Sequence, residues 1–165
     1  MDVMRFESWD QISEKMRSER DLSNADLSGL DLSGKRLAGL NAENMSLRGA
    51  NLNKAVLAGI NLEGGDLREA DLTDALVAGA NLEDADLTGA DLSRSKWLGV
   101  NVEGADFTGT TTAGAQGFGV SWGSAKVPPT AAPEMFPIQM IVAPILVLVG
   151  LVSLIAILLL RRQRR

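Results

Sequence analysis

The chain has 165 residues, a formal net charge of -5, and no cysteine, histidine or tyrosine. This composition excludes disulfide bonds, thiolate nucleophiles, imidazole bases and histidine metal ligands. We therefore expect no catalytic residue, no cofactor-binding residue and no metal site, and we do not expect an enzyme.

Residues 1–19 are predicted to form an amphipathic capping helix. From Val3 to about Ser18, apolar residues recur at three- and four-residue spacing and mark one helical face. These residues are Phe6, Trp9, Ile12 and Met16. A helix that lies on a membrane surface favours a basic polar face, whereas this face is mixed and slightly acidic. The helix is therefore expected to cover the start of the region that follows it.

Residues 20–109 consist of eighteen five-residue units without any change of phase, centred on every fifth residue from Leu22 to Phe107. Thirteen of the eighteen centres are Leu, nine of the positions two before a centre are Ala, and thirteen of those one before it are Asp or Asn, which chance would not produce. A five-residue unit cannot bury its leucine alone. The units must therefore stack in a coiled repeat.

Units such as Ala70-Asp71-Leu72-Thr73-Asp74 resemble the pentapeptide-repeat family. The resemblance implies an all-β fold, a right-handed four-sided β-solenoid, also described as a quadrilateral β-helix. Each unit then forms one side, four units form one coil, and the central residue and the small residue two before it point inward. At ~4.8 Å per coil, four and a half coils make a rod about 20 Å long. We expect its core to be filled, with no room for a ligand.

Two kinds of inward residue depart from the repeat. Lys35 occupies a position usually held by Ala, so that side is either distorted or Lys35 extends outward to water. Trp97 and Phe107 are too bulky for a regular coil, and we expect them to close the end of the rod, with Phe118 and Trp122 as further candidates.

Residues twenty apart are expected to stack on the same side of the rod. One such row is an acidic ladder, formed by Glu43, Glu63, Glu83 and Glu103. A divalent cation such as Ca²⁺ can bridge carboxylates, but the other ligands of such a site are missing, so we interpret the row as a solvated acidic stripe. The Asp and Asn residues before the centres are interpreted as turn-forming residues.

A second row on another side is smooth and apolar, and we refer to it as the contact strip. It consists of Ala38, Val56, Ala58, Leu76, Ala78 and Leu98. Arg36 and Lys96 bracket it. Exposed apolar strips on small domains often mark contacts with another protein. Two alternatives remain open: either the strip binds a partner or a second copy, or the N-terminal helix or the linker near Phe118 and Trp122 covers it.

Three segments follow the repeats. Residues 110–137 are rich in Gly, Pro and Thr and are predicted to be a linker, and residues 138–160 carry no charge and are long enough for a single transmembrane helix. Residues 161–165 form a basic tail. Small residues that suit helix packing in lipid are Ala143, Gly150 and Ser153, and the residues expected to contact lipid headgroups are Arg161, Arg162, Arg164 and Arg165.

The orientation of this membrane segment is set by two opposing signals. The terminal arginines favour a cytoplasmic C-terminus, which would place the solenoid outside. Residues 1–7, however, do not show the basic start and apolar run of a secretory signal. We expect the solenoid to lie in the cytoplasm, held by a C-terminal single-pass anchor.

These features predict a non-enzymatic, membrane-anchored interaction or scaffold protein. We expect an accessory subunit that docks on a larger membrane protein complex through its solenoid face and its transmembrane helix, with self-association as a further option. The alternative is an acidic DNA mimic that regulates a nucleic-acid enzyme such as gyrase, because some pentapeptide-repeat proteins act in this way. Basic residues such as Arg48, Lys54 and Arg68 on the rod, and an anchor at the membrane, oppose this alternative, and binding to nucleic acid itself is not expected.

Overall fold

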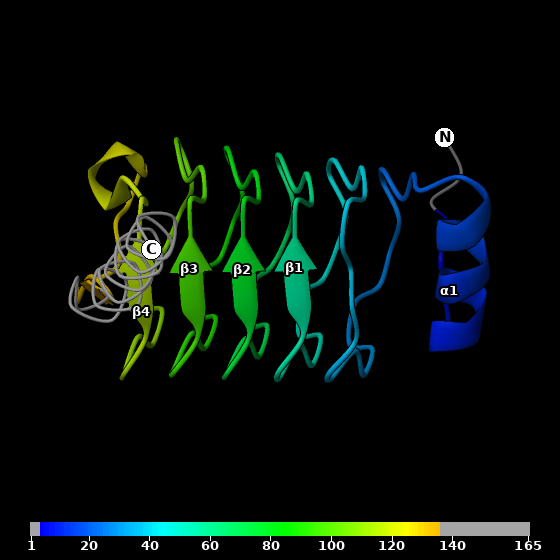
Figure 1. The fold of residues 1–165 in the computed structure, drawn as a ribbon, viewed down its shortest axis with the longest axis horizontal. Coiled ribbons are helices and arrows are strands. Elements are labelled where there is room, and N and C mark those ends of the chain that lie inside the picture. The colour runs from blue at the N-terminus through cyan, green and yellow to red at the C-terminus, as the bar shows by residue number, and fades with distance from the viewer. Residues whose placement is uncertain (1–3, 136–165) are drawn as a thin grey trace, which may run out of the picture. The chain divides into compact units, whose positions relative to one another are not determined.

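The computed structural model describes residues 4–135. The chain begins with helix α1 (Trp9–Ser18), and strands β1 (Val56–Ala58), β2 (Leu76–Ala78), β3 (Lys96–Leu98) and β4 (Gln116–Phe118) follow at twenty-residue intervals. A 3₁₀ helix, η1 (Trp122–Ser124), and strand β5 (Glu134–Met135) come last. Figure 1 shows the successive coils stacked side by side, with α1 at the N-terminal end of the stack.

The helices among residues 4–135 are too short or too polar to cross a membrane. The predicted transmembrane helix at 138–160 and the basic tail at 161–165 lie outside the described residues. The same holds for the packing residues Ala143, Gly150 and Ser153 and for the four terminal arginines.

The coil is four-sided, because backbone pairing recurs every twenty residues. Strands β1 to β4 pair in parallel in this register, with Val56 opposite Leu76 and Leu76 opposite Lys96. On the other three sides the pairing is reduced to single parallel bridges, such as Asp21 with Asn41. The chain is thus a β-solenoid with parallel strands, as the repeats predict, and its N-terminal helix is present.

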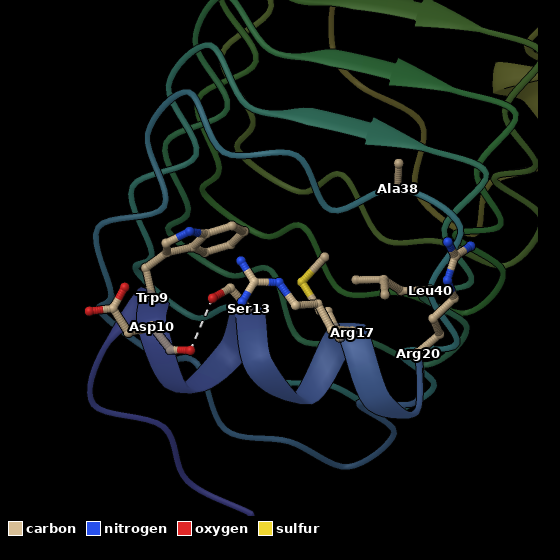
Figure 2. A pocket seen from close by; sticks show the side chains of 8 residues that line it. Trp9, Asp10, Ser13, Arg17, Arg20, Ala38 and Leu40 are labelled. Atoms are coloured by element: carbon tan, nitrogen blue, oxygen red, sulfur yellow. Dashed lines mark hydrogen bonds between the residues drawn. The ribbon is translucent and has the colours of Figure 1, made fainter.

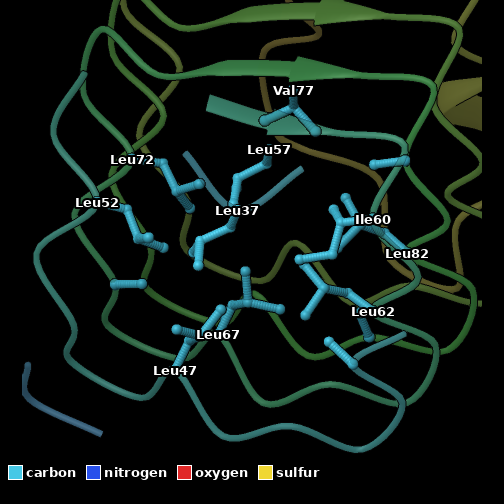
Figure 3. Packing of buried hydrophobic residues seen from close by; sticks show 14 of the residues in the cluster. Leu37, Leu47, Leu52, Leu57, Ile60, Leu62, Leu67, Leu72, Val77 and Leu82 are labelled. Atoms are coloured by element: carbon cyan, nitrogen blue, oxygen red, sulfur yellow. The ribbon is translucent and has the colours of Figure 1, made fainter. Parts of the chain in front are cut away.

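The interior is a column of aliphatic side chains. Every predicted centre from Leu22 to Phe107 is buried, and so are the nine alanines that lie two residues before a centre. Figure 3 shows leucines from several sides meeting around the axis. Burying one leucine contributes roughly 1.5–3 kcal/mol, which a single unit cannot obtain without its neighbours.

Each corner of the coil needs a residue with left-handed backbone. From Asn24 to Gly119, every fifth residue has a positive φ, and most of these residues are glycine. Lys54 (φ 58°) and Glu69 (φ 61°) adopt the same conformation in spite of their side chains. An L-residue in this region costs roughly 1–2 kcal/mol, so the stacked neighbours must hold these corners in place.

Aspartate and asparagine before the centres shape the turns, as expected. The carboxylate of Asp21, for example, accepts a hydrogen bond from the backbone N–H of Ser23 at 3.0 Å. Such a side chain competes with neighbouring strands for that N–H. The side with β1 to β4 has Val56, Leu76, Lys96 and Gln116 at this position instead, and regular strands form there. The repeat sequence therefore favours strands on one side and turns on the others.

The N-terminal capping helix starts later in the chain than predicted. Helix α1 begins at Trp9 rather than near Val3, because Arg5 bridges Asp26 and the N–H of Phe6 donates to the carbonyl of Asp26 at 3.2 Å. The segment before the helix thus pairs with a side of the first coil. Ile12 of α1 is fully buried in the core cluster, so the helix covers the coil as expected.

The side chain of Lys35 extends out of the core, which is one of the two alternatives predicted for it. Its Nζ lies 5.3 Å from the centre of the Trp9 ring on the capping helix. A cation over an indole face gains about 0.5–1 kcal/mol when exposed. The first coil accepts a lysine because the helix supplies this partner.

The predicted end of the repeats at Gly109 is too early. Strand β4 pairs with β3, and the N–H of Glu134 donates to the carbonyl of Ala115 at 3.0 Å, so much of the predicted linker 110–137 is folded. Gly117 occupies a central position, and the Trp122 ring would lie only 3.2 Å from a Cβ placed there. The repeat is hard to recognise in this coil because an aromatic ring from the following segment replaces the leucine.

Three aromatic rings fill the last coil. The ring centres of Trp97 and Trp122 are 5.5 Å apart, and Phe107 lies 6.2 Å from Trp97 and 5.6 Å from Trp122, all edge to face. The predicted role of these three residues in closing the rod agrees with this packing. Phe118 does not take part, because it is 48% exposed on the outside of the coil.

The buried indole of Trp97 has a hydrogen-bond partner that the sequence pattern does not predict. Its indole N–H donates to the hydroxyl of Ser95 at 2.8 Å, and both residues are fully buried. The hydroxyl in turn donates to the carbonyl of Leu92. Ala55 and Ala75 occupy the corresponding positions in earlier coils, so the serine occurs where the core holds an indole.

Candidate protein-interaction face

The contact strip lies along the outer surface of β1 to β3 and continues to Ala38 in the coil before them. Its residues alternate with the buried centres Leu57, Val77 and Trp97, and each of them is half-buried. Figure 1 shows the strands that carry the strip in line along the rod. Phe118 pairs with Leu98 in β4 and extends the strip by one coil.

Helix α1 does not cover the part of the strip on β1 to β3, because it makes no close backbone contact with strands β1 to β4; Ala38 alone lies beside the helix. The aromatic ring of Trp122 packs on Trp97 in the core and not on the strip. The corner beside the strip is formed by glycines, and a Cβ on Gly59, Gly79 or Gly99 would meet no atom within 4 Å. In the part of the chain that the structure describes, the corner beside the strip therefore has no side chains that would obstruct a partner.

The strip is small compared with a protein interface. Five strand-like rows at ~4.8 Å make it about 20 Å long. Two outward residues on each strand, about 7 Å apart, give with their side chains a width of roughly 10 Å and an area of about 200 Å². A stable complex usually buries ~800 Å² on each partner. The strip matches the width of one α-helix, about 10 Å, more closely than the footprint of a flat dimer.

The acidic ladder lies on the adjacent side and is held by an asparagine ladder that the sequence pattern alone does not reveal. The side-chain amides of Asn61, Asn81 and Asn101 donate to the asparagine of the preceding coil at 3.2, 3.0 and 2.9 Å. The Asn61 amide also donates to Glu43 at 2.9 Å, and the Asn101 amide donates to Glu83 at 3.3 Å.

This asparagine ladder orders the carboxylates without neutralising them. Asn61, Asn81 and Asn101 each contribute two amide hydrogens, which explains why asparagine rather than aspartate recurs on this side. No group of three or more carboxylates within residues 4–135 is placed to hold a metal ion. The side therefore presents negative charge supported by neutral amides.

The side opposite the strip carries paired charges. The guanidinium of Arg68 binds Asp66 and lowers the pKa of that carboxyl, although partial burial acts in the other direction. Hydrogen bonds from the side chain and backbone of Ser28 likewise hold the pKa of Asp26 below its usual value. These charges are therefore engaged in contacts within the solenoid.

The fold and its surfaces define a class of protein: a four-sided parallel β-solenoid whose interior is filled by its own side chains. Residues 36–68, 65–109 and 85–116 match the family described as pentapeptide repeats, in eight copies. The repeat region thus belongs to the pentapeptide-repeat family, whose members are generally non-enzymatic structural or interaction proteins. No curated protein matches the chain.

Solved structures with similarity to the chain include several pentapeptide-repeat proteins. One from the Arabidopsis thaliana thylakoid lumen is 26% identical, with 69% of this chain and 72% of that protein aligned and a TM-score of 0.47. Rfr23 from the cyanobacterium Cyanothece 51142 is 22% identical over 70% of this chain and 99% of its own, with a TM-score of 0.33. QnrB1, described as a plasmid-mediated fluoroquinolone resistance protein, is 19% identical over 65% of this chain and 62% of its own, with a TM-score of 0.46.

Proposed function

We propose that this protein is a non-enzymatic interaction module that docks on a protein partner through the contact strip. The observation that carries the proposal is the apolar row Ala58, Ala78 and Leu98 on β1 to β3, with Val56 and Leu76 beside it and a corner of glycines that leaves it open within residues 4–135. The size of the strip favours one helix of the partner lying along the rod. A helix spanning about 20 Å has about 13 residues.

We further propose that residues 138–160 anchor this module in a membrane, so that its partner is a subunit of a larger membrane complex. The support is the sequence itself, which has 23 residues there without a charge, followed by four arginines within the last five residues. Protease treatment of sealed vesicles tests both the anchoring and the cytoplasmic side that we favour. Release of the chain by a carbonate wash would refute the anchor.

Docking is tested by photo-crosslinking from the two opposite sides of the solenoid. A photoreactive amino acid replaces Ala78 on the strip or Thr88 on the opposite side, in the full chain in its native cells. We expect one defined crosslinked product from position 78 and none from position 88. Equal crosslinking from both sides would contradict the proposal.

The partner obtained in this way is then measured against a matched pair of variants. Val56→Gln with Leu76→Gln removes the apolar surface but keeps a side chain that β4 accepts at the same position, Gln116. Burial of such side chains is worth roughly 1.5–3 kcal/mol each, so binding should weaken at least tenfold while unfolding changes little. Thr88→Gln on the opposite side is the control and should bind normally. Equal loss of folding and binding would show that the strip is needed for packing alone.

The acidic ladder gives some support to DNA mimicry, since no Lys or Arg lies in the ladder rows. Its charge density opposes the idea, however. The ladder carries one glutamate per ~4.8 Å, whereas duplex DNA carries one charge per ~1.7 Å. An assay of DNA supercoiling by gyrase, with and without the purified chain, separates the two functions, and inhibition or protection of the enzyme would favour mimicry.

A further inference from the structure

A groove of about 570 Å³ lies between the capping helix and the first coil, outside the contact strip except at Ala38. Figure 2 shows Leu40 on the coil near Arg17 and Arg20, whereas Ala38 lies farther along the same coil with its side chain pointing away from the helix. The lining residues are Trp9, Asp10, Ser13, Met16, Arg17, Arg20, Ala38 and Leu40.

The groove has an apolar part, formed by Trp9, Met16, Ala38 and Leu40, beside four polar or charged lining residues. Leu40 is buried, and Trp9 and Met16 are only half-buried and pack against the core. A half-exposed indole beside a thioether and a leucine is suited to hold an apolar side chain of a ligand.

The charges at the groove are mainly positive, although the chain as a whole is acidic. Arg20 has no carboxylate within 4.0 Å in the described part of the chain, and Arg17 contacts only Glu14, at 3.4 Å, with both side chains about three-quarters exposed. Lys35 lies over Trp9. Asp10 is the single acidic residue that lines the groove.

Arg20 is fixed in place by its backbone. It adopts a left-handed conformation with φ 51°, and its carbonyl accepts a hydrogen bond from the N–H of Asn41 at 3.0 Å. Its guanidinium lies 3.5 Å from the position that a Cβ on Gly39 would occupy. The start of the first coil therefore presents an arginine at the groove from a rigid backbone.

We propose that this groove binds an extended acidic segment of a partner protein, with a carboxylate on Arg20 and an apolar side chain between Trp9 and Leu40. Arginine is suited to this because its planar guanidinium forms paired hydrogen bonds with a carboxylate. The ten residues of α1 span about 15 Å, which equals some five residues of extended peptide. An anionic membrane surface fits less well, because Ile12 on the apolar side of α1 is buried against the coil.

The test is fluorescence anisotropy with the full chain and a labelled pentapeptide, Glu-Phe-Glu-Leu-Glu. We expect saturable binding that weakens with salt, and no binding of the matched peptide Lys-Phe-Lys-Leu-Lys. Arg20→Asn removes the charge but keeps a residue that tolerates positive φ, and it should weaken binding at least tenfold with an unchanged melting curve. Arg48→Asn, on another side of the solenoid, is the control and should bind like the original chain.

Three results with the peptides would overturn the proposal: equal binding of the lysine peptide, equal affinity of the Arg20→Asn and Arg48→Asn variants, or no binding of the acidic peptide. Vesicles of phosphatidylglycerol and phosphatidylcholine serve as the competing ligand. If Arg20→Asn lowers vesicle binding and the acidic peptide does not compete, the surface recognises lipid and the proposal is wrong. The Val56→Gln, Leu76→Gln variant should bind the peptide normally, because this groove does not depend on docking at the contact strip.

Discussion

Replacing Ser95 with Ala should reveal how the solenoid accommodates a tryptophan in its core. The change removes the hydrogen-bond acceptor of the buried Trp97 N–H and leaves the backbone and the packing intact, since Ala55 and Ala75 fit the same position in other coils. An unsatisfied buried donor costs about 1–3 kcal/mol. We expect a loss of stability within this range.

The measurement is urea unfolding of the 165-residue chain followed by circular dichroism, in a double-mutant cycle with Trp97→Phe. In the Trp97→Phe background there is no indole N–H, so Ser95→Ala should change the free energy of unfolding by less than about 0.5 kcal/mol. The coupling between the two sites should then be at least about 1 kcal/mol. An equal cost of Ser95→Ala in both backgrounds would refute the hydrogen-bond explanation, and would point to the contact of Ser95 with Leu92 instead.

Two further predictions concern the turns and the C-terminal coil. Because hydrogen bonds hold the pKa values of Asp26 and Asp106 below their usual range, their contribution to stability is present above about pH 4 and is lost as the pH falls through the folded-state values. Asp26→Asn with Asp106→Asn should therefore flatten the dependence of the urea midpoint between about pH 5 and pH 2.5, and an unchanged slope would contradict this role. Gly117→Leu restores the usual central residue of the repeat, yet it should destabilise the chain by about 1–3 kcal/mol, because the Trp122 ring already occupies that space. A stabilised variant in thermal unfolding would show that Trp122 moves away at little cost.

The five-residue period was sufficient to predict the core and the stacking of units, and the resemblance to the pentapeptide-repeat family implied the four sides. The reason is local and repetitive: a leucine at a fixed position in every unit must point inward, and a twenty-residue coil then places every outer residue on a known side. The contact strip and the acidic ladder could be identified in the same way, because each is a row of residues twenty apart.

The ends of the solenoid depended on contacts that no period contains. Gly117 can be recognised as a central residue of the repeat only from its contact with the Trp122 ring. Lys35 is tolerated at an inward position because Trp9 lies beside it. At both ends of the solenoid, the residues that contact the repeat come from segments outside it, so the repeat period does not predict them.

The groove at the first coil likewise depends on a contact between the repeat and a segment outside it. Arg17 and Arg20 are ordinary surface residues in the sequence, and they become part of one site with Leu40 only when α1 folds over the coil. The sequence alone therefore determined the repeating body of this protein, since each unit repeats the same local packing problem. Only the tertiary structure decided how the two ends of the solenoid are covered, because the terminal coils are buried by side chains from the segments next to them.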